Sequence, residues 1–99
     1  MTEIEFDENK RYQTLIERNL DFADANQLFL GLHFTNEDCR KNYGERRYIS
    51  IGIVNNRLVV VAWTYRPSED NPMYRRIISM RKANEREIKR YCQYSGAYS

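Results

Sequence analysis

The chain has 99 residues, of which 41% are hydrophobic and 30% are charged. This length allows one domain with one core, and the composition excludes a disordered or membrane-spanning chain. The formal net charge is only +2, but residues 1–38 hold nine acidic and three basic side chains, whereas residues 39–99 hold five acidic and thirteen basic ones.

This uneven charge leaves two interpretations open. Either the fold mixes both halves into one surface, or a basic face for a polyanion lies opposite an acidic helical layer. Arginine dominates the basic residues, which favours the second interpretation slightly, because the guanidinium fork binds phosphate well.

The start of the chain and its cysteines suggest where the protein works. Residues 1–5 are acidic and lack the basic and apolar pattern of a secretory signal. Cys39 and Cys92 are far apart, and His33 is the one histidine. We therefore expect a cytoplasmic protein with free thiols, no metal site and no cofactor.

The N-terminal part predicts a short strand and then two helices. Alternation over residues 2–6 indicates an edge strand. Asp7 is suited to cap a helix that continues from Lys10 to Arg18. The apolar residues of this helix recur at helical spacing and form one stripe: Tyr12, Leu15, Ile16 and Leu20.

A second helix is expected directly after the first. Asp21 is its predicted N-cap, and Gly31 suits its end. Its apolar stripe is Phe22, Ala25, Leu28 and Phe29. Residues 33–35 then predict a short strand, and residues 36–44 a polar loop.

Three strands and a helix complete the predicted order. The strands cover residues 46–54, 58–66 and 74–81, with a tight turn at Asn55-Asn56 and a loop over residues 67–72. Isoleucines 49, 51 and 53 share one face of the first of them, and the valine-rich second strand is expected at the centre of the sheet.

The last helix is predicted from residue 85 to about residue 93. Asn84 and Glu87 have the spacing of a capping box. The expected inward positions are Ile88, Tyr91 and Cys92, and residues 94–99 are expected to form a frayed tail.

These elements together indicate a single domain over residues 1–99 of the α+β class. We expect an antiparallel sheet of about four strands, with two N-terminal helices and one C-terminal helix gathered on one face. The other face would then be free for a ligand.

Four ordered stretches of the sequence resemble the BrnT family of toxins. They are Phe6-Asp7-x-x-Lys10, Phe22-x-x-Ala25-x-x-x-Phe29, Gly44-Glu45-x-Arg47, and the block Arg76-Ile77-Ile78-Ser79-x-Arg81-x-Ala83-x-x-x-Glu87-x-x-x-Tyr91. The run 58–61 followed by Thr64-x-Arg66 also fits. The sequence departs from the family where Thr14 replaces an asparagine and where Glu17-Arg18-Asn19 replaces a Lys-His-Gly turn.

The resemblance implies a RelE-like fold and a ribonuclease toxin of a type II toxin–antitoxin system. It implies RNA as the substrate and a BrnA-like antitoxin, a ribbon-helix-helix protein, as the partner. Operator DNA would be bound only through that antitoxin, and no membrane is involved.

Arginines are the side chains that suit metal-independent cleavage of RNA. In that reaction the 2′-hydroxyl attacks the neighbouring phosphorus, and the enzyme must stabilise extra negative charge on the phosphate. Arg47, Arg66, Arg76 and Arg81 lie near the ends of predicted strands. The resemblance selects Arg66 and Arg81 first and Arg47 next as catalytic residues.

Other side chains complete the hypothesis. Glu45 is a candidate general base, although a simple ion pair with Arg47 or a neighbour is the more ordinary role for it. The residues expected to bind substrate are Arg76, Lys10, Lys82 and Tyr65. In a regular strand, Arg75 and Arg81 share a face and Arg76 lies on the opposite one.

Three non-catalytic interpretations of these residues and of the protein stay open. The arginines are also typical of ordinary solvent-facing strand residues, and His33 suits a packed or surface position better than a catalytic one. A degenerate module that binds an antitoxin or RNA without turnover is the alternative to the enzyme.

Overall fold

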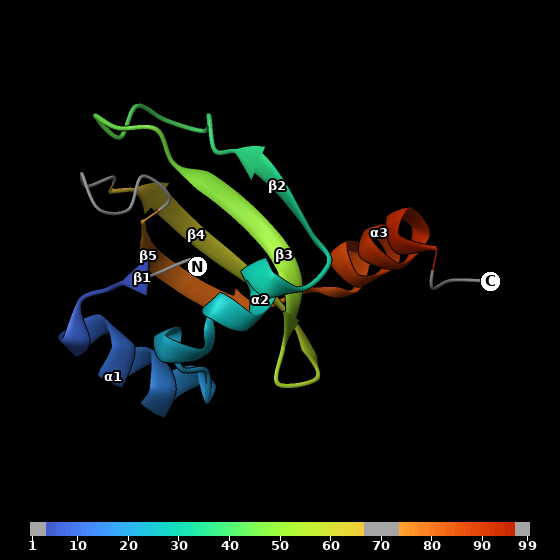
Figure 1. The fold of residues 1–99 in the computed structure, drawn as a ribbon, viewed down its shortest axis with the longest axis horizontal. Coiled ribbons are helices and arrows are strands. Elements are labelled where there is room, and N and C mark those ends of the chain that lie inside the picture. Colours follow the sequence, from blue (N-terminus) through green and yellow to red (C-terminus); the bar gives the residue numbers. More distant parts are fainter. Residues whose placement is uncertain (1–3, 67–73, 97–99) are drawn as a thin grey trace.

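Figure 1 shows the computed structural model, which describes residues 4–66 and 74–96. Within these residues a five-stranded sheet has the order β1-β5-β4-β3-β2. Its strands are β1 (Ile4–Glu5), β2 (His33–Glu37), β3 (Tyr48–Val54), β4 (Arg57–Tyr65) and β5 (Arg75–Lys82). The helical elements are α1 (Glu8–Arg18), the short 3₁₀ helix η1 (Phe22–Asp24), α2 (Asn26–Leu30) and α3 (Glu85–Ser95). The α+β class is therefore confirmed.

The sheet is mixed, not purely antiparallel as predicted. Strand β1 pairs with β5 in parallel, whereas the other three pairings are antiparallel. The predicted number of about four strands is also wrong, because the sheet has five strands in the described part of the chain. The partner of β1 lies some seventy residues further along the chain, and no local pattern specifies such a distant pairing.

The hairpin between β3 and β4 is confirmed. Asn55 and Asn56 both have positive φ, 49° and 64°, which is the geometry that a two-residue hairpin turn requires. Strand β4 lies at the centre of the sheet between β3 and β5, as its run of valines predicts.

The hydrophobic core lies between η1, α2 and one face of the sheet, which we call the first face. Asp21 caps η1 by accepting a hydrogen bond from the backbone of Ala23, at 2.9 Å. The predicted second stripe is buried, but it is divided between η1 and α2 instead of forming one helix. The core residues are Leu20, Phe22, Ala25, Leu28, Phe29, Val54, Val59, Val61, Trp63, Ile77 and Met80.

Helix α1 leaves most of its apolar stripe exposed. Asp7 caps the helix as predicted, and Asn19 ends it in the left-handed conformation. However, Tyr12 and Ile16 are 67% and 65% exposed, and Leu15 is 38% exposed. Polar contacts attach the helix to the fold, since Arg11 Nε binds Asp21 at 2.8 Å. The amphipathic spacing predicted this helix correctly, but it did not predict that the apolar stripe stays largely exposed.

The isoleucines of β3 lie on the opposite face of the sheet, which we call the second face. Ser50, Gly52 and Val54 point to the core and are buried, whereas Ile49 and Ile51 are half-buried and Ile53 is exposed. Small residues therefore face α2, and the larger isoleucines form a second apolar surface.

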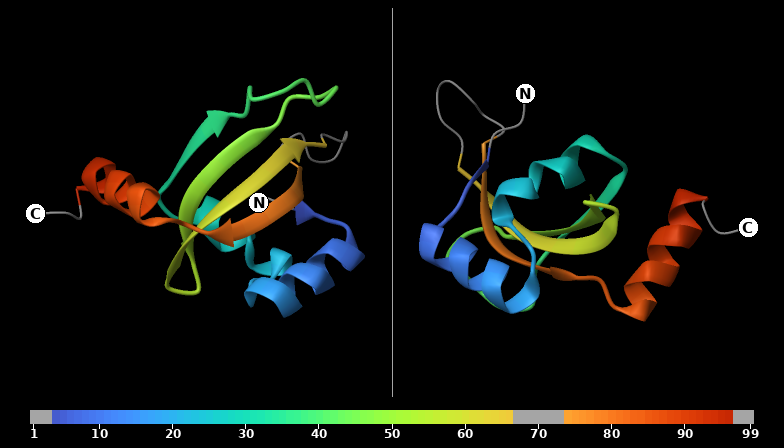
Figure 2. Two further views of the ribbon diagram at one scale, coloured as in Figure 1. Left: turned by 180° about the vertical axis from the view of Figure 1, so that it is seen from behind. Right: turned by 90° about the horizontal axis from the view of Figure 1, so that it is seen from below.

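Helix α3 covers part of the second face, so the prediction that all helices share one face is wrong. Figure 2 shows α3 well away from α1 and α2. The aromatic ring of Phe34 on β2 contacts Tyr91 and Tyr94 of α3, with ring centroids 5.6 and 5.9 Å apart. These aromatic contacts, together with a hydrogen bond from the Tyr91 hydroxyl to the Leu32 carbonyl at 2.9 Å, hold α3 in place.

The limits of α3 differ slightly from the prediction. The capping box of Asn84 and Glu87 is confirmed. The helix continues to Ser95, so Tyr94 and Ser95 are helical and not part of a tail, and Gly96 caps it with φ 74°. Ile88 is 42% exposed and does not point inward as expected, whereas Tyr91 and Cys92 are half-buried. The predicted loop over residues 67–72 lies outside the described residues.

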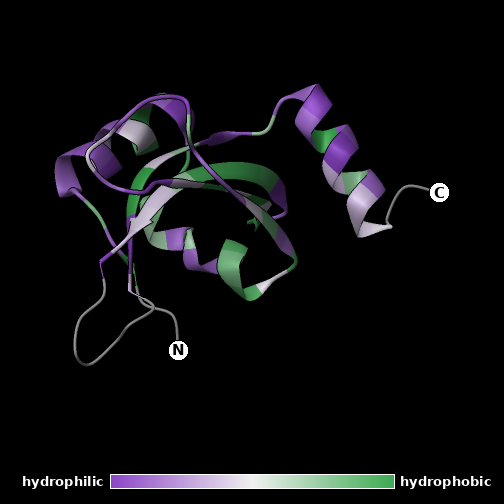
Figure 3. Cartoon of the chain, turned by 90° about the horizontal axis from the view of Figure 1, so that it is seen from above, coloured by the Kyte–Doolittle hydropathy of each residue, from purple (hydrophilic) through white to green (hydrophobic). Residues whose placement is uncertain are grey.

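Hydropathy follows this arrangement. Figure 3 shows hydrophobic residues concentrated in the central strands, whereas α3 is largely hydrophilic. In the described part of the chain, no helix combines the length and the apolar character needed to cross a bilayer.

Candidate functional site

A β-bulge in β5 decides which arginines share a face. Ala62 pairs with Ser79, but the next residue, Trp63, pairs with Ile77, so Ile78 is an extra residue in β5. The bulge reverses the alternation of side chains along the strand. The prediction that Arg75 and Arg81 share a face, with Arg76 on the opposite one, is therefore wrong.

The arginines of β5 are distributed accordingly. Arg75 lies opposite Tyr65 and is buried toward the first face. Arg76 and Arg81 lie opposite Thr64 and Val60 and share the second face. Basic side chains of the C-terminal half therefore lie on both faces, and α1 is not acidic, since residues 8–18 hold three basic and two acidic side chains.

Glu45 lies between two arginines where β3 begins and β4 ends. Arg66 Nη1 donates to Glu45 Oε1 at 3.0 Å, and Arg47 Nε donates to Oε2 at 3.2 Å. The pairing of β3 with β4 places the loop before β3 beside the end of β4, which explains why residues so far apart in sequence meet. Three of the four predicted catalytic residues are therefore together; we call them the Glu45 cluster.

The Glu45 cluster keeps its carboxylate charged. The hydrogen bond from Arg66, followed by the one from Arg47, holds the pKa of Glu45 below its usual value. A carboxylate with a lowered pKa is a weak proton acceptor. The main physical effect of Glu45 is thus to hold two guanidinium groups in fixed positions.

A second carboxylate extends this arrangement. The guanidinium of Arg47 stacks over the Tyr43 ring at 4.2 Å, and the Tyr43 hydroxyl donates to Asp38 at 3.0 Å. Arg40 binds both oxygens of Asp38, at 2.8 and 2.9 Å, and these bonds hold the pKa of Asp38 far below its usual range. The sequence reasoning missed Asp38, Arg40 and Tyr43, because it treated residues 36–44 as a plain polar loop.

Arg81 lies apart from the Glu45 cluster. Its guanidinium binds both oxygens of Glu87 on α3, at 2.8 and 2.9 Å. Arg81 pairs with Val60, six strand positions from Arg66, which corresponds to roughly 20 Å along the strand. The prediction that strand arginines converge therefore holds for Arg47 and Arg66 but not for Arg81.

The pKa of Arg81 depends mainly on Glu87. The hydrogen bond to Glu87 raises the pKa of Arg81, and the charge of Arg40 opposes this rise. The Glu45 cluster and Arg81 are thus two separate cationic groups, each bound to a carboxylate.

Replacing Glu87 by glutamine is expected to lower the free energy of unfolding by up to about 1 kcal/mol at neutral pH. Glutamine keeps the capping box but not the charge that binds Arg81. That bond holds the pKa of Glu87 below its usual value of 4.5. The charge therefore stabilises the fold above that value, and the effect is lost as pH falls through the lower folded pKa.

Urea unfolding of both proteins at several pH values checks this expectation. The two stabilities should differ at neutral pH and converge in acid. A difference that persists unchanged in acid would show that the Glu87 charge is not its source.

The predicted substrate-binding residues do not converge on one site. Arg76 pairs with Glu5 at 3.5 Å, and Lys10 lies in a hollow between α1 and β5. Lys82 is exposed at the end of β5. Tyr65 packs edge-on against Trp63, with ring centroids 4.9 Å apart, and so contacts its own aromatic neighbours.

Two further side chains belong to the fold and not to the second face. His33 packs edge-on against Phe29 at 5.5 Å, which agrees with a packed histidine. Arg75 stacks over the rings of Phe29 and Trp63 at 4.1 and 4.7 Å, and burial lowers its pKa. Within residues 4–66 and 74–96, no three His, Cys, Asp or Glu side chains are grouped to hold a metal ion.

Comparison with known proteins identifies a family for this chain. The family described as "Ribonuclease toxin, BrnT, of type II toxin-antitoxin system" matches residues 6–87. A search of curated proteins found no match. The matched range includes the Glu45 cluster, Arg81 and Glu87. The chain therefore belongs to the BrnT family of ribonuclease toxins, which act on RNA and are paired with an antitoxin.

Proposed function

We propose that this toxin cleaves single-stranded RNA without a metal ion and that the Glu45 cluster binds the phosphate that is cut. The observation that carries this proposal is the pair of guanidinium groups fixed on one carboxylate. Glu45 uses only Nη1 of Arg66 and Nε of Arg47. Each arginine therefore keeps N–H groups that can bind a phosphate oxygen.

The reaction follows from the chemistry of the ribose. The 2′-oxygen forms a bond to phosphorus, the bond from phosphorus to the 5′-oxygen breaks, and a 2′,3′-cyclic phosphate remains. The 2′-hydroxyl proton passes to Glu45 or to water, and the 5′-oxygen takes a proton from water. Since Glu45 is a weak base, most of the acceleration comes from the charge of Arg47 and Arg66 in the transition state.

Arg81 has a different role in this proposal. Its distance from the Glu45 cluster is too large for both to bind one phosphate, so Arg81 binds a flanking phosphate of the same strand. The tight bond to Glu87 keeps the Arg81 guanidinium in place on the second face.

The partner completes the proposal. We infer that a BrnA-like ribbon-helix-helix antitoxin inhibits the toxin in the cytoplasm and that operator DNA is bound only through the antitoxin. Family membership supports this assignment, because type II toxins are neutralised by a protein partner.

Cleavage of end-labelled single-stranded RNA in EDTA tests the enzymatic proposal. The purified chain should produce fragments with 2′,3′-cyclic phosphate ends, and the double variant Arg47→Ala plus Arg66→Ala should not. Lys89→Ala is the matched control, because it removes an exposed cation from α3 on the side away from the second face.

Two results would contradict the proposal. If EDTA stops cleavage, a metal ion takes part. If the chain cuts neither free RNA nor RNA on translating ribosomes, the protein is a binding module without turnover.

A further inference from the structure

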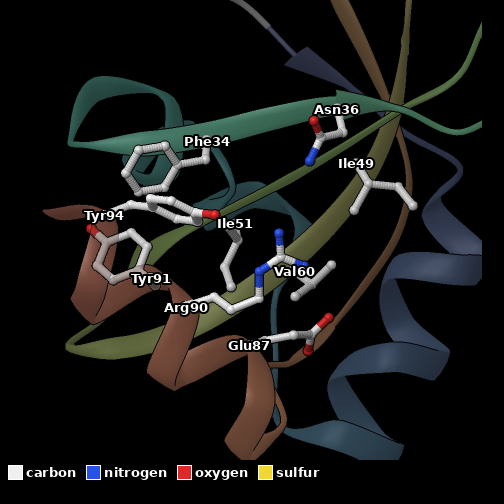
Figure 4. A pocket seen from close by; sticks show the side chains of 9 residues that line it. All are labelled: Phe34, Asn36, Ile49, Ile51, Val60, Glu87, Arg90, Tyr91 and Tyr94. Carbon is white, nitrogen blue, oxygen red and sulfur yellow. The ribbon is translucent and has the colours of Figure 1, made fainter.

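A groove lies between α3 and the second face of the sheet, beyond the Glu45 cluster. Its volume is about 150 Å³, which is close to the size of one planar heterocycle. Figure 4 shows its lining: Phe34, Asn36, Ile49, Ile51, Val60, Glu87, Arg90, Tyr91 and Tyr94.

The walls of the groove suit a flat aromatic ligand. Ile49, Ile51 and Val60 form an aliphatic floor, and three aromatic rings from β2 and α3 stand beside it. Tyr94 is 66% exposed, so one of its faces is available to a ligand. Tyr91 is fixed by its hydrogen bond to the Leu32 carbonyl, which keeps the wall rigid.

The polar groups of the groove suit a base attached to a phosphate chain. Figure 4 shows the Arg90 guanidinium extending from α3 over Val60, with the Asn36 amide directed into the same space. In the described part of the chain, Arg90 has no carboxylate partner, and its guanidinium carbon lies 5.9 Å from the centre of the Tyr94 ring. An amide offers a donor and an acceptor to a base edge, and a guanidinium binds phosphate.

The groove is continuous with the basic second face. Val60 in its floor pairs with Arg81, and Arg81 binds Glu87 at the groove's edge. Among the residues that line the groove, Arg90 is the cation, and Arg81 lies beside the groove paired with Glu87. The Arg90 charge favours an anionic ligand over a neutral apolar peptide. Unpaired RNA bases are recognised in this way, by stacking on aromatic rings and by hydrogen bonds to their edges.

We propose that this groove binds one unpaired nucleobase of the RNA and so selects where the strand lies. The inference rests on the proposed ribonuclease function and adds a specificity site to it. With the base in the groove, its phosphates contact Arg90 and Arg81, and the strand continues past Arg40 toward the Glu45 cluster.

Binding of short 2′-O-methyl RNA tests the proposal separately from cleavage. Such strands lack the attacking hydroxyl and stay intact. Fluorescence anisotropy with labelled A5, C5, G5 and U5 at one salt concentration should show a preference for one base. Tyr94→Ala should weaken binding of the preferred strand on the order of tenfold, and Tyr94→Phe should restore it.

Matched variants separate the contributions of ring stacking, of hydrogen bonds to the base edge and of charge to RNA binding. Tyr12→Ala removes an equally exposed tyrosine from α1 and should leave binding unchanged. Asn36→Ala should reduce the preference between bases more than the overall affinity. Arg90→Ala should weaken all four strands alike, whereas Lys89→Ala should have little effect.

The outcomes distinguish this inference from the proposed function. Equal binding of the four strands, unaffected by Tyr94→Ala, overturns the nucleobase groove even if the toxin cleaves RNA. Unchanged RNA binding with weaker antitoxin binding overturns it too and assigns the groove to the partner protein. Tyr94-dependent binding in a chain that cleaves no RNA supports the groove and refutes only the enzymatic proposal.

Discussion

Replacing Arg66 by alanine is expected to lower the rate of RNA cleavage by about two to three orders of magnitude. Arg66 donates to Glu45 at 3.0 Å and, in the proposed mechanism, faces the phosphate on which charge develops. A positioned donor of this kind acts mainly in the transition state, so kcat should fall much more than KM rises. Single-turnover cleavage of a labelled oligonucleotide measures the effect.

Three further variants make this result specific. Arg66→Lys keeps the charge but loses the planar fork, so its rate should lie between those of the wild type and Arg66→Ala. Arg81→Ala should lose about tenfold or less, because Arg81 binds a flanking phosphate. Lys89→Ala should cleave normally. A larger loss in Arg81→Ala than in Arg66→Ala would place the scissile phosphate at the junction of β5 and α3 instead.

Replacing Phe22 by alanine is expected to reduce the free energy of unfolding by about 3–5 kcal/mol. Phe22 is 1% exposed and contacts the Phe6 ring edge-on, with centroids 6.0 Å apart. A domain of this size has roughly 5–15 kcal/mol of stability in total, so the loss is a large fraction of it. The melting temperature should fall by about 15–30 °C, as measured by circular dichroism.

Tyr12→Ala is the matched control for this stability experiment. It also removes an aromatic ring from the N-terminal helical region, but that ring is 67% exposed. Its effect should stay within about 0.5 kcal/mol. If the two variants lose equal stability, then α1 packs through its apolar stripe and the described arrangement of α1 is incorrect.

The sequence was sufficient for features whose physical causes are local. Asp7 and Asn84 cap helices because their side chains accept hydrogen bonds from backbone groups within the next three residues. Asn55 and Asn56 form the tight turn because asparagine tolerates positive φ. The family resemblance was also visible in the sequence, since it depends only on residue types in order.

The meeting of Glu45 with Arg47 and Arg66 was predictable only in part. The Glu45-x-Arg47 spacing suggests a local pair, which the structure contains. Arg66 joins them because β3 and β4 pair in one particular register, and side-chain neighbours across a sheet depend on that register. The contribution of Asp38, Arg40 and Tyr43 could not be foreseen, because a loop without periodicity gives no indication of its own contacts.

Only the tertiary structure decided which surfaces meet. The stripe on α1 and the isoleucines of β3 are regular patterns in the sequence, but a pattern specifies a face and not what covers it. The extra residue Ile78 reversed the face of Arg75 relative to Arg81, and α3 packed on the second face through Phe34, Tyr91 and Tyr94. The sequence by itself thus determined most of the elements, their caps and the family. The sides on which the arginines and α3 lie depend on distant pairing and packing, which no short stretch of sequence contains.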